Sequence, residues 1–147
     1  MDINSLKYIL VDSGITDEEE LIGCSEEAIS DIEKNINHEL PQSYRTFLSI
    51  CGVSAGEYLK GTDIFYDVIL DLQQWGAELL EESGAIEKLP NNAFIFFMHQ
   101  GYELGYFLLS DDDDPPVFFY TEGDASPVRK WNSFTDFIEQ VIIGQKE

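Results

Sequence analysis

The stretch FLLSDDDDPPVFFY, residues 107–120, sets Asp111, Asp112, Asp113 and Asp114 directly before two prolines. Carboxylates at this density could hold a cation, exchange protons, meet a basic partner or keep a turn in water. An EF-hand calcium loop needs alternating ligands, a glycine and a distal glutamate, which are absent from this order. Since consecutive side chains also diverge, we predict no metal site. A solvated turn and a contact for a basic partner are the two interpretations left open.

The other reactive side chains are few and scattered. His38 and His99 fall in different predicted elements, and we expect both to be structural. Cys24 and Cys51 fit no metal-ligand spacing, and Cys51 is predicted to be a buried thiol. A hydrolase with paired carboxylates would need two acids to converge in a pocket, one of them with a raised pKa. We therefore predict no catalytic residue, no metal and no cofactor.

The charge of the chain restricts its partners. Its 147 residues contain 8 Lys and Arg against 29 Asp and Glu, which gives a net charge of −21. Nucleic acids and anionic membranes are disfavoured as partners because their binding depends on Lys and Arg. Basic proteins are favoured, although excess charge also aids solubility. The acidic start, without a signal peptide, and the lack of a membrane-length apolar run predict a cytoplasmic protein.

The elements that would position these residues begin with helices. An apolar stripe occupies residues 6–10, and residues 16–19 have the form of a capping box. Ser25 is predicted to cap a second helix, with Glu26 and Glu27 in its first turn. A third helix is expected to begin at Pro41 and to end at Gly52.

The rest of the chain is predicted to contain both strands and helices. We expect short strands at 56–66 around Lys60 and Gly61, then a helix at 68–83. Three apolar runs and a candidate fourth strand, with short turns between them, predict an antiparallel meander, followed by a helix capped by Ser133. These runs are residues 93–99, 103–109, 117–120 and 128–131. The order predicts an α+β fold, with N-terminal, middle and C-terminal helices packed on the sheet, as one domain of residues 1–147.

Several motifs in this order resemble the SMI1/KNR4 family of the SUKH superfamily. LPQSYRTFL at 40–48, followed by Cys51 and Gly52, resembles the family's LP-x-x-Y/F-x-x-F/L…G helix. Ile29 and Glu33 match its I-x-x-x-E helix. The remaining motifs of the family follow in the same order along the chain. They are LP at 89–90 with FIFF at 94–97, ELGYFLL at 103–109, PVFFY at 116–120 and WNSFTDF at 131–137. One departure is that Cys51 stands where the family usually has asparagine before the glycine.

The resemblance implies a function as well as an α+β fold. Bacterial members of the family are mostly immunity proteins that bind and neutralise a cognate toxin, often a nuclease, and no shared catalytic centre is known. We therefore expect a bacterial immunity protein that binds a basic nuclease toxin through an acidic surface. The alternative is a non-catalytic regulatory module with a non-toxin partner, as in fungal members. The oligomeric state is left open.

The predicted toxin contact centres on the four aspartates. Other acids and three tyrosines are expected to share their face, with the tyrosines as aromatic anchors where they are not part of the core. The contact is predicted to comprise Asp111, Asp112, Asp113, Asp114, Glu103, Glu122, Asp124 and Tyr102, with Tyr106 and Tyr120 as further candidate anchors.

Overall fold

The computed structural model describes residues 2–56, 62–66 and 68–146, with side chains as far as residue 140. It is an α+β structure, as predicted. Its elements are η1 (Ile3–Ser5), α1 (Leu6–Asp12), η2 (Glu18–Glu20), β1 (Leu21–Ile22), α2 (Glu26–Ile36), α3 (Gln42–Cys51), β2 (Ser54–Ala55), β3 (Thr62–Asp63), α4 (Asp71–Glu82), β4 (Ala93–His99), β5 (Glu103–Leu108), β6 (Val117–Thr121), β7 (Val128–Trp131) and α5 (Phe134–Lys146).

The main sheet is the predicted antiparallel meander. Its strands lie in the order β3-β4-β5-β6-β7, and every neighbouring pair is antiparallel. The bounds predicted for β4 and β7 are confirmed, and those of β5 and β6 differ by one residue at one end. Gln100 and Gly101 form the β4–β5 turn with φ values of 52° and 78°, a left-handed geometry that glycine adopts at no steric cost.

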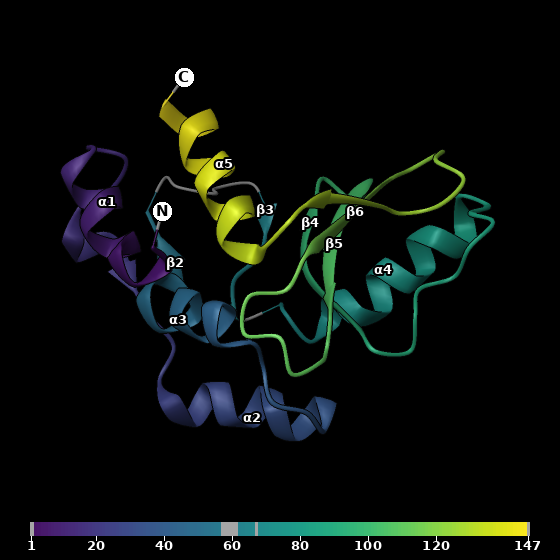
Figure 1. The fold of residues 1–147 in the computed structure, drawn as a ribbon, viewed down its shortest axis with the longest axis horizontal. Helices are drawn as coiled ribbons and strands as arrows, with labels where there is room; N and C mark the ends of the chain where they lie inside the picture. Colours follow the sequence, from purple (N-terminus) through teal and green to yellow (C-terminus); the bar gives the residue numbers. More distant parts are fainter. Residues whose placement is uncertain (1, 57–61, 67, 147) are drawn as a thin grey trace.

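Helices cover both faces of this sheet. Figure 1 shows α4 on one side, α3 and α5 on the other, and α1 and α2 further out beside α3. Gly76 lets α4 approach closely, because a Cβ at this position would lie 2.2 Å from Cδ1 of Ile95. A glycine inside a helix is usually unfavourable, but at this position the packing of α4 on β4 requires it.

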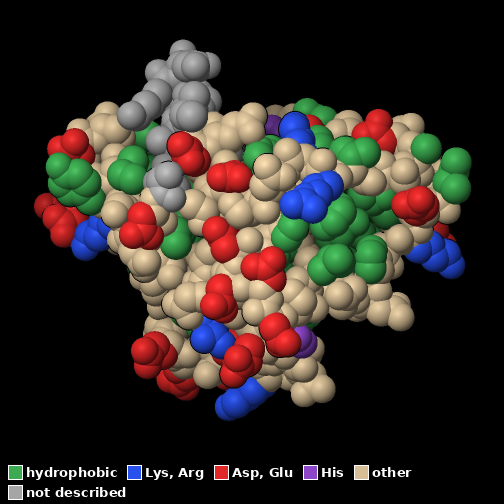
Figure 2. Space-filling model, in the orientation of Figure 1, with side chains coloured by type: hydrophobic (Ala, Val, Ile, Leu, Met, Phe, Trp, Pro, Cys, Tyr) green, Lys and Arg blue, Asp and Glu red, His purple; other side chains and the backbone are tan. Residues whose placement is uncertain are grey.

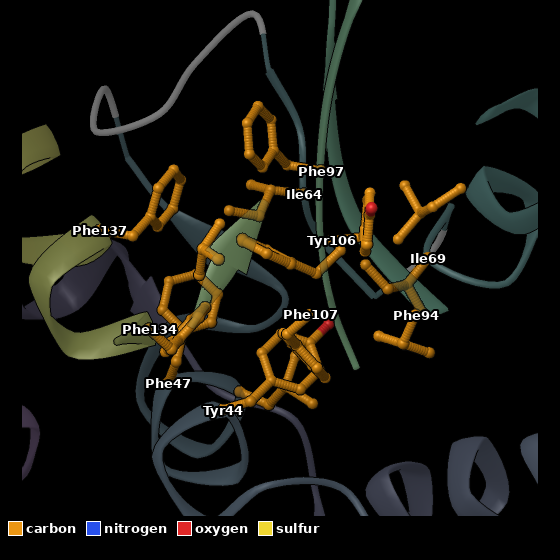
Figure 3. Packing of buried hydrophobic residues seen from close by; sticks show 14 of the residues in the cluster. Tyr44, Phe47, Ile64, Ile69, Phe94, Phe97, Tyr106, Phe107, Phe134 and Phe137 are labelled. Carbon is orange, nitrogen blue, oxygen red and sulfur yellow. The ribbon is translucent and has the colours of Figure 1, made fainter. Parts of the chain in front are cut away.

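Aromatic side chains fill the space between the sheet and the helices α3 and α5. The ring of Tyr44 lies 5.2 Å from that of Phe107 and 5.5 Å from that of Phe134, measured between centroids. Phe96 packs edge-on against Phe134 at 5.2 Å. Figure 3 shows these rings converging from α3, β5 and α5. Burial of large aromatic side chains is a dominant source of core stability, so this cluster fixes α3 and α5 on the sheet.

A second glycine shapes the sheet itself. Gly105 pairs with Phe97 across β4 and β5, and a Cβ at Gly105 would lie 1.9 Å from Cε1 of Phe97. The ring of Phe97 therefore lies flat over the glycine. The register of the two strands shifts between Ile95 and Phe97, which turns two successive phenylalanines of β4 toward α5.

Two predicted helix caps are confirmed. The hydroxyl of Ser25 accepts a hydrogen bond from Ala28 N at 3.1 Å, and that of Ser133 accepts one from Asp136 N at 3.0 Å. These bonds satisfy amides that have no partner within the helix. Pro41 lies at the N-cap position of α3, and Gly52 follows its last residue, as expected.

The predictions for two other regions need correction. Residues 16–19 form no capping box, because η2 is a single 3-10 turn and Asp17 makes no side-chain cap. The chain then enters β1, which pairs with β2 in a separate two-stranded sheet. Of the strands expected at 56–66, the described residues contain β3, whereas residues 57–61, with the turn expected at Lys60 and Gly61, lie outside the described part of the chain.

Candidate protein-binding surface

The acidic loop joins β5 to β6, as predicted, and its four aspartates differ in exposure. Asp111, Asp112 and Asp113 are exposed, whereas Asp114 is half-buried. The Asp114 amide donates to Oδ1 of Asp112 at 2.9 Å, which tightens the loop into a turn. The first three side chains are therefore available to a partner, and the fourth faces the protein.

The loop is bound to the N-terminal ends of two helices. Ser43 N in α3 donates to the Asp113 carbonyl at 2.9 Å, and Thr135 N in α5 donates to Oδ1 of Asp114 at 3.0 Å. The first amides of a helix lack partners within it, and negative charge is favourable at that end. Asp114 therefore has a structural role, beyond keeping a turn in water.

The remaining predicted contact residues lie at the opposite end of the sheet. Glu103 pairs with His99 and Thr121 at the start of β5, whereas the acidic loop follows the end of that strand. The six residues of β5 span roughly 20 Å, which separates Glu103 from the acidic loop. The expectation that Tyr102, Glu103, Glu122 and Asp124 share a face with the loop is therefore wrong.

Several residues at this far end serve the sheet itself. Glu122 N donates to the carbonyl of Tyr102 at 2.8 Å, and Oδ2 of Asp124 accepts from Thr121 N at 3.3 Å. The hydroxyl of Tyr120 donates to the carbonyl of Asp124 at 3.1 Å. Of the three candidate anchors, Tyr106 and Tyr120 are core residues, and Tyr102 is 37% exposed.

The densest acidic region was missed by the sequence analysis. Residues 12–31 contain many carboxylates and no Lys or Arg. All of these carboxylates are exposed on η2, α2 and the segments around them. A count of charge along the sequence would have found them, whereas four adjacent aspartates drew attention elsewhere. The acids are Asp12, Asp17, Glu18, Glu19, Glu20, Glu26, Glu27 and Asp31.

Two neighbouring hollows along α3 connect the acidic loop with Glu26 of this region. A hollow of about 250 Å³ beside the loop is lined by Asn4, Gln42, Thr46 and Asp113. Gln42 and Thr46 also line a hollow of about 430 Å³ between α3 and α2, together with Glu26. Figure 2 shows acidic side chains gathered at the bottom of the view, around α2. We call this surface, from the loop across α3 to residues 12–31, the acidic surface.

An ion pair holds α2 and α3 together beneath the acidic surface. Oε2 of Glu33 accepts from Leu40 N at 2.6 Å, and from Nε and Nη2 of Arg45 at 3.1 and 2.8 Å. Three donors on one carboxylate oxygen form a strong, charge-assisted junction. Glu33, which sequence reasoning matched only to a family motif, thus sets the position of α2 on α3.

The histidines lie within hydrogen-bond distance of other protein groups, and the cysteines are buried. Nδ1 of His38 lies 2.7 Å from a backbone carbonyl oxygen, and Nδ1 of His99 lies 3.1 Å from Oγ1 of Thr62. Cys24 and Cys51 are buried free thiols, and burial raises the pKa of Cys24 to about 11 and that of Cys51 to about 12. No group of three His, Cys, Asp or Glu side chains in the described part of the chain is placed to hold a metal.

These features define an α+β protein with an aromatic core and an extended acidic surface. The chain belongs to the SMI1/KNR4 family (SUKH-1), whose family model matches residues 23–140. Immunity proteins are common in this family. No curated protein matches the chain significantly. Among the described residues, no helix has the length and apolar character needed to cross a membrane.

Proposed function

We propose that this chain is a bacterial immunity protein that binds a cognate toxin, a basic nuclease, and blocks it by occupying its surface. The observation that carries the proposal is the acidic surface on a member of a family rich in immunity proteins. Residues 12–31, which are part of this surface, contain eight Asp and Glu and no Lys or Arg.

The inhibition would use electrostatic mimicry of the nuclease's substrate. A nuclease cleft holds phosphates with Lys and Arg, so carboxylates on a complementary surface can pair with the same side chains. Opposite net charges also steer two proteins together before contact, which raises the association rate at low salt. The immunity protein needs no catalytic group for this mechanism.

The loop residues Asp111, Asp112 and Asp113 are our proposed contacts within the acidic surface. Their carboxylates are exposed, and the loop is held in place by its bonds to α3 and α5. A preformed loop loses little conformational entropy when it binds. We place the residues at the far end of β5 outside this contact, because the length of that strand separates them from the acidic loop. They are Tyr102, Glu103, Glu122 and Asp124.

Coexpression with a candidate nuclease toxin domain, chosen from a reading frame adjacent to that of this chain, tests the function. Cells that carry both proteins should survive, and the purified proteins should associate more slowly at high salt because salt screens exposed charge. Death of the coexpressing cells would refute the immunity function. Binding of a non-toxin protein in its place would identify a regulatory module.

Charge removal tests the site. The triple variant D111N/D112N/D113N should weaken toxin binding on the order of tenfold, since each exposed charge pair contributes modestly. The matched control is D71N/E81Q/E82Q, which removes three exposed acids of α4 on the other side of the sheet. Equal weakening by both variants would indicate general attraction and would remove the loop from the contact.

A further inference from the structure

Two aliphatic side chains are exposed in the middle of the N-terminal acids. Ile22 in β1 is 51% exposed, and Val53, directly before β2, is 46% exposed. Val53 N donates to the carbonyl of Ile22 at 2.9 Å, so the two residues are adjacent although 31 positions separate them. Isolated apolar residues are normal on protein surfaces, but an adjacent pair is a small apolar patch.

The backbone beneath this patch is rigidly held. Cys24 N donates to the Leu48 carbonyl of α3 at 2.8 Å. Gly23 approaches α3 so closely that a Cβ would lie 1.8 Å from the carbonyl oxygen of Ser49. β1 is thus fixed against the last turns of α3. Leu21 and Cys24 pack against the core, whereas Ile22 faces outward. A partner would meet the patch already formed.

Several acids flank the two patch residues in the chain. Glu18, Glu19 and Glu20 come just before β1, Glu26 and Glu27 follow shortly after it, and all are exposed. Among the described residues, Glu18 of this group is paired with a cation, because Nζ of Lys7 lies 3.1 Å from its Oε1. In Figure 2 the left side of the view, over α1, likewise shows apolar side chains among acidic ones. An apolar centre with a charged rim is the usual anatomy of a protein interface.

We propose that Ile22 and Val53 form the apolar centre of the toxin contact, and that the toxin places an apolar or aromatic side chain there, flanked by Lys and Arg. This inference rests on the proposed function and names the point of contact. The acids near the patch favour a basic protein as the occupant, because opposite charges attract. A second copy of this chain would set the same carboxylates against each other, and anionic lipids would be repelled as well.

The test measures binding of an inactivated form of the toxin domain to surface variants. The double variant I22S/V53S should bind on the order of a hundredfold more weakly, mainly through faster dissociation, because truncated central residues carry most of the binding energy. The matched control I86S/V128S makes the same chemical change at side chains that are 81% and 55% exposed elsewhere. It should bind within about twofold of the unaltered protein.

Thermal unfolding of each variant separates loss of binding from loss of fold. If the double variant is unstable, the single variant I22S should still bind on the order of tenfold more weakly. Unchanged binding by folded I22S/V53S would overturn the inference and leave the immunity function standing. Failure of the unaltered protein to bind the toxin would overturn both. Self-association that I22S/V53S abolishes would assign the patch to a second copy and would also overturn the inference.

Discussion

Replacement of Asp114 by alanine should destabilise the fold, although the residue belongs to a run of four seemingly equivalent aspartates. Its Oδ1 accepts from Thr135 N at the start of α5, at 3.0 Å, and its side chain is half-buried. Alanine would leave that amide without a partner and would remove a negative charge from the positive end of the helix.

The expected cost follows from these two contributions. Loss of a side-chain acceptor at a helix N-terminus costs about 1 kcal/mol, and loss of the favourable charge costs about 0.3–1 kcal/mol. The sum is about 1–2 kcal/mol, or a fall in Tm of roughly 3–6 °C for a protein of this size. Asparagine keeps an oxygen acceptor, so D114N should lose less than half as much.

Thermal and urea unfolding of D114A, D114N and D111A would check this reasoning. D111A is the matched control, because Asp111 is exposed in the same loop, and it should change the free energy of unfolding by less than about 0.5 kcal/mol. Equal effects of D111A and D114A, or no effect of either, would refute the structural role of the Asp114 carboxylate.

Four further predictions concern buried or partly buried groups. E33A should cost about 1–2 kcal/mol in chemical unfolding, because it removes the acceptor that the Leu40 amide and the Arg45 guanidinium share, although Glu39 still lies near Arg45; a loss under about 0.5 kcal/mol would contradict the junction. G105A should cost about 2–3 kcal/mol, since its Cβ would displace the ring of Phe97; an unchanged Tm would contradict this packing. Cys24 and Cys51 should resist a thiol reagent at pH 8 until the protein is unfolded, and fast labelling of the folded protein would disprove their burial. Because burial raises the folded pKa values of these thiols to about 11 and 12, above the ordinary value of 9.0, the free energy of unfolding should fall as pH rises above 9. Unfolding measured at about pH 8 and 10.5 would check this.

Local patterns predicted the C-terminal half of the fold well. The predicted runs gave the bounds of β4 and β7, and the short gap between the first two runs gave the turn between β4 and β5. The N-terminal half depends on contacts between distant segments, which a local pattern does not contain. The apparent capping box failed for this reason, because pairing with β2 draws the chain into β1 soon after η2.

The candidate site was predicted less completely. The predicted meander already implied that the turns beside Glu103 and Glu122 lie at one end of the sheet and the aspartate loop at the other, because antiparallel strands reverse direction. The different role of Asp114 was out of reach, since it depends on where α5 begins in space. The acids of residues 12–31 were visible in the sequence as an excess of charge.

The attachment of the acidic loop gives the protein two internal reporters. The amide protons of Ser43 and Thr135 are bonded to the loop and not to their own helices. Their hydrogen–deuterium exchange rates therefore follow loop opening, separately from unfolding of α3 and α5. A partner that clamps the loop should slow exchange at both amides together, even though they lie 92 positions apart in the chain.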